Sequence, residues 1–108
     1  MLNLDTIINQ AEEVVIFGEH IHVKQPSVRM YMQISEIEKD LNESNLLEKR
    51  VEVAQILLNN NTEGRAFEKS EVEQLPRSAI ETLVILISEM KIKADNDPNS
   101  KSPSPKVK

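Results

Sequence analysis

Apolar and polar residues change their spacing along this chain of 108 residues, and each change marks an expected element. Between 4 and 11, apolar residues recur at helical spacing behind Asn3, a suitable N-cap, which predicts a short helix. Between 13 and 24, β-branched residues crowd on both sides of Gly18-Glu19, which predicts a β-hairpin with a two-residue type II′ turn. The chain is therefore expected to begin with a short helix and a two-stranded ribbon.

The expected hairpin has two faces of different character. If Phe17 pairs with His20, one face collects four β-branched side chains that should pack against helices: Val14, Ile16, Ile21 and Val23. The other face mixes two apolar side chains with polar ones: Val15, Phe17, His20, His22 and Lys24. An isolated ribbon of this kind has open edges. Two interpretations stay open, since the ribbon either serves self-association or partner docking, or is covered by a second helix.

Amphipathic stripes predict two helices after the hairpin. Pro26 and Ser27 end the ribbon and begin a helix that runs to about Asn42, with an apolar stripe at Met30, Ile34, Ile37 and Leu41. Asn45 is a suitable cap for the next helix, whose stripe is Leu47, Val51, Ala54 and Leu58. The run of Asn residues at 59–61 is expected to end that helix, and 62–69 to form a loop.

The last part of the folded region predicts one short and one longer helix. Ser70 and Glu73 have the spacing of a capping box, and Pro76 marks a restart rather than the middle of a helix. In the final helix, 79–90, the apolar positions form a stripe too wide for one buried face. We expect this helix to be the centre of the bundle, with an oligomer interface as the alternative.

These elements predict a mainly α protein with a small N-terminal β-hairpin, in which three to four helices form a bundle. The helical domain is expected to span 1–93, with the hairpin at 13–24. Residues 94–108 are rich in Ser, Pro and Lys and hold almost no apolar side chains, so we expect a flexible tail.

Charge and composition narrow the classes of function. Residues 1–92 carry nine Lys and Arg against sixteen Asp and Glu, a net charge of −7, and a body this acidic lacks a patch for phosphate groups. We therefore expect no nucleic acid as partner. No apolar run approaches the ~20 residues of a membrane span, so we expect a cytoplasmic protein without membrane contact. The absence of Cys excludes disulfides and thiolate chemistry.

The residues that could carry chemistry do not converge on a reaction centre. His20 and His22 point the same way from one strand and could share a metal with a neighbouring Glu, but solvent-facing histidines are the commoner outcome. Glu36 and Glu38 lie two positions apart on a helix and therefore point apart. With only two Gly in the chain, no phosphate-binding loop is present. We expect no enzyme activity, no metal and no cofactor.

The run from Val14 to Val28, a hairpin closed by Pro and Ser and followed by about three amphipathic helices, resembles the tail assembly chaperones of long-tailed bacteriophages and related prophages. The similarity covers roughly 13–92 in pattern. The Leu75-Pro76 junction before the last helix and the charged Ser/Pro/Lys tail also look like that family.

The resemblance implies a non-catalytic protein that coats the tape measure protein and keeps its apolar helical segments soluble until tail tube subunits arrive. In that family a programmed frameshift often appends a second domain that recruits the tube protein. Such a role implies a homo-oligomer in the host cytoplasm and a broad, adaptable apolar surface. The residues expected to bind the partner are Val15, Phe17, Met32, Val84, Leu86 and Ile87, whereas Met30 and Met90 are expected in the core.

Two other functions stay open. The acidic surface could make this a small regulatory or inhibitory protein that blocks a basic site on a host or nucleic-acid-binding protein. A helix-turn-helix regulator built from 45–92 is disfavoured, because its recognition helix, 79–91, offers almost no polar side chain to a base edge.

Overall fold

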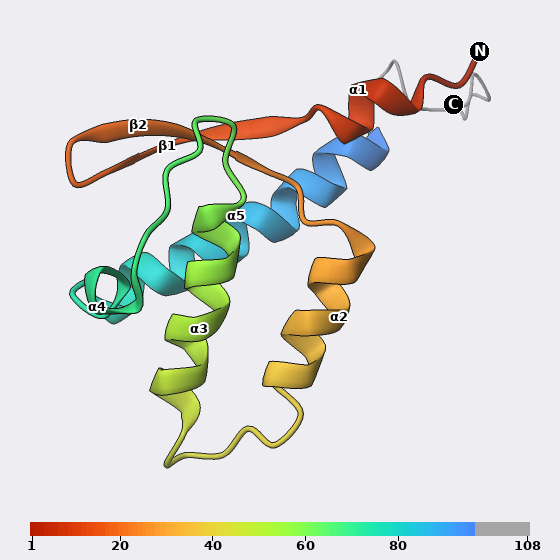
Figure 1. The fold of residues 1–108 in the computed structure, drawn as a ribbon. Coiled ribbons are helices and arrows are strands. Elements are labelled where there is room, and N and C mark those ends of the chain that lie inside the picture. The colour runs from red at the N-terminus through yellow and green to blue at the C-terminus, as the bar shows by residue number, and fades with distance from the viewer. Residues whose placement is uncertain (97–108) are drawn as a thin grey trace.

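A computed structural model describes residues 1–96 as five helices and one antiparallel hairpin (Figure 1). Their order is α1 (Leu4–Ile8), β1 (Ala11–Ile16), β2 (Glu19–Lys24), α2 (Val28–Ile37), α3 (Leu46–Asn59), α4 (Lys69–Val72) and α5 (Arg77–Asn96). The predicted class, mainly α with an N-terminal hairpin, is confirmed. Of the tail predicted at 94–108, the first three residues belong to α5 and the rest lies outside the described residues.

The caps predicted for the first two helices are confirmed, but both helices end early. The Asn3 side chain accepts a hydrogen bond from the Asp5 backbone N–H at 3.0 Å, and Ser27 Oγ accepts one from the Met30 N–H at 3.2 Å. Helix α1 stops at Ile8 because the chain enters β1 at Ala11, where pairing with β2 replaces helical bonds. Helix α2 stops at Ile37 rather than near 42.

The hairpin turn lies one residue earlier than the sequence predicts. Phe17 and Gly18 both have positive φ, at 53° and 79°, which is the geometry of a type I′ turn, so the predicted type II′ turn at Gly18-Glu19 is wrong. Ile16 consequently pairs with Glu19, and the predicted pairing of Phe17 with His20 does not occur. The partners shift by two residues, an even number, so every side chain keeps its predicted face.

The apolar face of the hairpin packs on the helices, as predicted. Ile16, Ile21 and Val23 are buried in the core, and Val14 packs against it while partly exposed. In the view of Figure 1, α5 runs beneath the hairpin from α4 toward α1. These four β-branched side chains therefore cover one side of the core, which an additional helix would cover in a helical bundle.

Helix α3 is the common partner of the other elements, since it packs against α2, α4, α5 and β2. Its buried residues occupy more than one side of the helix: Val51, Val53, Ala54, Leu57 and Leu58. The predicted stripe missed Val53 and included Leu47, which is exposed. The central position expected for 79–90 therefore belongs to α3, and a regular bundle of three to four helices is not confirmed.

Helix α5 begins after Pro76, as the restart signal predicts, and buries one row of side chains: Ile80, Leu83, Ile87 and Met90. Helix α4 starts one residue before the predicted capping box. Its cap is Glu68, whose backbone N–H donates to the Glu71 carboxylate at 2.9 Å, so Ser70 and Glu73 do not form the box.

Candidate partner-binding surface

One edge of the hairpin is closed by the loop that follows α3. The Lys24 N–H donates to the Asn60 carbonyl at 2.8 Å, the Thr62 N–H donates to the His22 carbonyl at 3.0 Å, and Val23 forms an antiparallel bridge with Asn61. This loop (green in Figure 1) therefore acts as a short third strand along the edge of β2 that faces away from β1.

A buried amide holds that loop in shape. The Asn61 side chain, only 8% exposed, donates to the carbonyls of Leu58 and Arg65, both at 2.7 Å. Its oxygen accepts from the backbone N–H groups of Glu63 and Arg65 at 3.1 and 2.9 Å. Both N–H groups and the oxygen of this amide therefore form hydrogen bonds within the turn of the loop.

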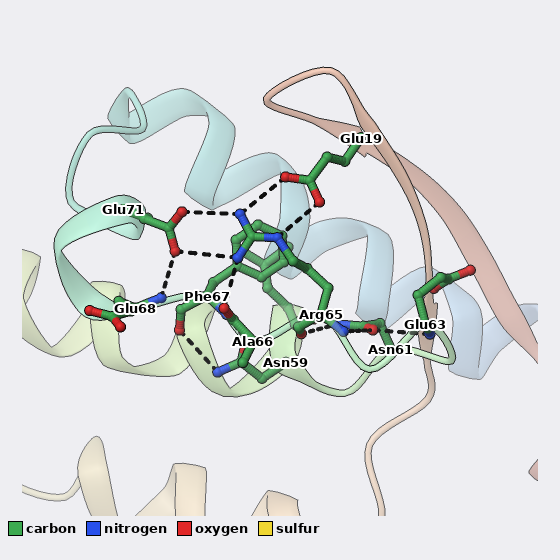
Figure 2. A network of polar contacts seen from close by, with 10 residues as sticks. Glu19, Asn59, Asn61, Glu63, Arg65, Ala66, Phe67, Glu68 and Glu71 are labelled. Carbon is green, nitrogen blue, oxygen red and sulfur yellow. Dashed lines mark hydrogen bonds and ion pairs between the residues drawn. The ribbon is translucent and has the colours of Figure 1, made fainter.

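The tip of the hairpin is tied to the same loop through Arg65 (Figure 2). Its guanidinium donates to both carboxylate oxygens of Glu19, at 2.9 and 3.1 Å, and its Nη2 also lies 3.0 Å from Glu71. These hydrogen bonds raise the pKa of Arg65 above its already high value, and the bond from Arg65 lowers the pKa of Glu71. A charged group therefore joins β2 to the start of α4 at any ordinary pH.

Two aromatic rings meet beside this guanidinium. Arg65 lies 4.0 Å from the ring centre of Phe67, which is buried, and the ring of Phe17 approaches Phe67 with 6.4 Å between centroids. Phe17 nevertheless stays half exposed and occupies a left-handed backbone conformation that a bulky residue adopts only at a cost. The turn thus presents a large apolar side chain to solvent at the tip of the ribbon.

The two histidines of the outer face each contact a different carboxylate. His22 Nδ1 lies 2.6 Å from Glu63, whose other oxygen accepts the His22 backbone N–H at 2.8 Å, and His20 Nδ1 lies 2.8 Å from Glu13. The bond to Glu63 raises the pKa of His22, and the pKa of Glu63 falls to about 2. Across the part of the chain that the structure describes, no three His, Asp or Glu side chains are grouped to hold a metal ion.

An apolar groove of about 320 Å³ lies along the opposite edge of the hairpin from the closing loop, between β1 and the first turns of α5. Its wall residues come from β1, the end of α3 and the segment 75–86: Val14, Val15, Ile16, Leu58, Leu75, Ser78, Ala79, Thr82, Leu83 and Leu86. Among the described residues that line it, only Ser78 and Thr82 are polar. The groove is of the size at which ligand-binding clefts begin, roughly 300 Å³.

The structure brings together only some of the residues that the sequence predicted for partner binding. Val15, 60% exposed, and Leu86 line the groove, and Phe17 lies at the hairpin tip. Within residues 1–96 no second helix covers Val15 and Phe17, which are 60% and 50% exposed, and the use of this face in self-association or partner docking stays a prediction.

The remaining predicted residues lie elsewhere. Met32, 67% exposed, is on α2, Val84 packs against the core while partly exposed, and Ile87 is a core residue that offers no surface to a partner in this conformation. Sequence reasoning missed Leu75, Ala79 and Thr82. No local pattern marks them, because they line a groove only when β1 lies alongside α5.

Comparison with protein-family models, with curated proteins and with solved structures finds no match for this chain. Among the helices described for residues 1–96, none combines the length and the apolar character needed to cross a membrane. The features of this protein that bear on its function are therefore the groove, the hairpin tip and the distribution of charge.

Proposed function

We propose that this protein is a non-catalytic tail assembly chaperone, which binds apolar segments of a tape measure-like protein and helps to recruit tail tube subunits. The single observation that carries the proposal is the uncovered apolar surface formed by the groove and the exposed side chains of Val15 and Phe17, here named the docking surface. Apolar surface of this kind on an otherwise charged protein is typical of a protein–protein contact.

The chemistry of the docking surface suits a partner with exposed apolar side chains. Burying such side chains against Val15 and the walls of the groove removes apolar area from water at roughly 25 cal/mol per Å². The acidic body, with a net charge of −7 over residues 1–92, then faces solvent and keeps the coated partner soluble. Coating by many copies needs no reaction centre, and cytoplasmic assembly follows from the same role.

The test is co-expression with the longest coiled-coil-like protein encoded nearby, followed by size-exclusion chromatography with light scattering at low and high salt. We expect a soluble complex with many copies of this chain per partner that survives high salt, because apolar contacts are not screened. A partner that precipitates while this protein elutes alone would overturn the proposal.

A matched pair of variants assigns the contact to the docking surface. Val15→Lys places a charge on that surface, whereas Val28→Lys makes the same change at an exposed residue at the start of α2. We expect Val15→Lys to weaken the complex about tenfold and Val28→Lys to leave it within about twofold of the wild type. Equal effects of the two variants would contradict this assignment.

The acidic surface favours one alternative, a regulatory or inhibitory protein that covers a basic site on a host or nucleic-acid-binding target. Its complex would depend on ion pairs and would weaken steeply as salt increases. The salt arm of the same experiment therefore separates the two functions.

A further inference from the structure

The backbone of β1 has an edge that is open along the groove. The His22 carbonyl and the Lys24 N–H point away from β1, toward the loop that closes β2. In an antiparallel pair, residues alternate between bonding the partner strand and pointing outward, so the residues of β2 that bond β1 are Glu19, Ile21 and Val23. Their partners on β1 are Ile16, Val14 and Glu12.

The backbone groups of Glu13 and Val15 consequently point outward from β1. The described contacts give these groups no backbone partner beyond the hairpin, in contrast to His22 and Lys24 on the opposite edge. An uncovered row of N–H and C=O groups is a template for one more strand.

The groove borders this edge rather than one face of the ribbon. Val14, Val15 and Ile16 all line it, although their side chains alternate between the two faces of the hairpin. The open space therefore runs along the strand at the level of its backbone, with apolar side chains of α5 beneath it. A strand added there would bond the edge and place every second side chain against Leu83 and Leu86.

We propose that the β1 edge binds an extended segment of a partner protein as an added strand, with alternating apolar side chains and Lys or Arg at its ends. This inference rests on the proposed function, because it assigns how a partner is held at the docking surface. Binding of this type takes affinity from backbone bonds and specificity from the pockets beside them.

Charge decides that the added strand comes from another protein. Strand β1, Ala11–Ile16, carries Glu12 and Glu13 and no Lys or Arg, whereas Glu19 at the hairpin tip is already paired with Arg65. Pairing β1 with a second copy would bring two such acidic segments together, whereas a strand with basic ends meets opposite charge. A basic, alternating segment is therefore the complementary occupant.

The probe is a synthetic peptide in which Val and Thr alternate over about six residues, flanked by Lys at both ends. We expect the full chain to bind it and the Glu13 and Val15 amides to become protected from hydrogen exchange. Val15→Pro removes an outward N–H that the hairpin does not use, and should weaken binding about tenfold. Val15→Thr keeps that N–H and should bind within about twofold of the wild type.

Several outcomes would overturn the inference. These are absence of binding, protection elsewhere than on β1, and equal affinity of Val15→Pro. Protection of β1 without peptide in a species of dimer mass would identify a second copy as the occupant. A large gain in affinity on deleting 97–108 would identify the chain's own end. If the co-expressed partner stays soluble with Val15→Pro, the strand-addition inference fails while the proposed function stands.

Discussion

The two edges of the hairpin differ in their backbone contacts, since within residues 1–96 the β2 edge is bonded to a loop and the β1 edge is not. The β2 edge is bridged by Asn61, flanked by hydrogen bonds from Lys24 and Thr62, and tied at its tip by the ion pair of Arg65 with Glu19. The β1 edge runs along an apolar groove and has no such cover among the described residues. Folded proteins usually cover or charge an edge strand, and β1 carries charge at Glu12 and Glu13 but, in the described part of the chain, has no cover beside the apolar groove, which is the arrangement that the proposed strand addition requires.

The rigidity of the β2 edge comes from a distant part of the chain. The residues that close β2 lie some forty positions away in the sequence, in the loop between α3 and α4. That loop is itself fixed by two side-chain amides, because the exposed Asn59 holds both backbone groups of Phe67 and the buried Asn61 holds the turn before it. A rigid β2 then presents β1 in one position, which favours binding of a strand without a large ordering cost.

The largest effect is expected from opening the closed edge. Asn61→Ala removes four hydrogen bonds of a buried amide and leaves backbone groups without partners, so we expect a loss of about 3 kcal/mol in the free energy of unfolding. Urea unfolding measures it, and faster hydrogen exchange at the Lys24 amide would show that the β2 edge has opened.

Asn42→Ala is the matched control for that variant. Asn42 also accepts several local hydrogen bonds, from Ser44 and Asn45, but it is exposed, so its loss should cost less than about 1 kcal/mol. If the two variants lose equal stability, the closure of β2 does not depend on the buried amide and the contrast between the edges weakens.

A smaller effect is expected at Phe17, where the two edges meet. Phe17→Asn and Phe17→Ala both remove the ring, but Asn accepts the left-handed conformation that residue 17 adopts, and Asn-Gly is the preferred type I′ pair. We expect the Asn variant to be more stable than the Ala variant by about 1 kcal/mol in thermal unfolding.

The same pair of changes at Val15, which lies in extended backbone, should not favour Asn. Both variants at residue 17 should also weaken the partner complex, since the exposed ring is lost. The stability difference between the Asn and Ala variants thus measures the backbone strain at Phe17, and the loss of binding in both variants measures the contribution of the ring to the partner complex.

The smallest effect concerns the contact of His22 with Glu63 at the closed edge. The raised pKa of His22 means that its contribution to stability is complete below about 6.5 and is lost as the pH rises through the raised value. The pKa of Glu63 falls from 4.5 to about 2, so its contribution is present above about 4.5 and is lost as the pH falls toward 2.

We therefore expect the wild type to exceed His22→Gln in Tm by more at about pH 5.5 than at about pH 8.5, measured by thermal unfolding. Glu63→Gln should reduce the same pH dependence. A difference in Tm between wild type and His22→Gln that does not change with pH would show that the contact with Glu63 does not hold the β2 edge.

Much of the local structure could be predicted from residues close together in the chain. Asn3 and Ser27 cap their helices as expected, and the even spacing of Val14, Ile16, Ile21 and Val23 puts them on the face that the core covers. The turn was placed wrongly because Gly18 suits either turn type, and the choice depends on contacts of Phe17 with Phe67 and of Glu19 with Arg65. Those contacts join residues about fifty positions apart and leave no local pattern.

The sequence by itself determined the element types, the two faces of the hairpin and the acidic balance, because periodicity, caps and charge are properties of neighbouring residues. Only the tertiary structure decided which edge of the hairpin is closed, that α3 rather than α5 is central, and that β1 and α5 enclose a groove. Each of these depends on which distant surfaces meet, and packing selects that arrangement from several with similar local preferences.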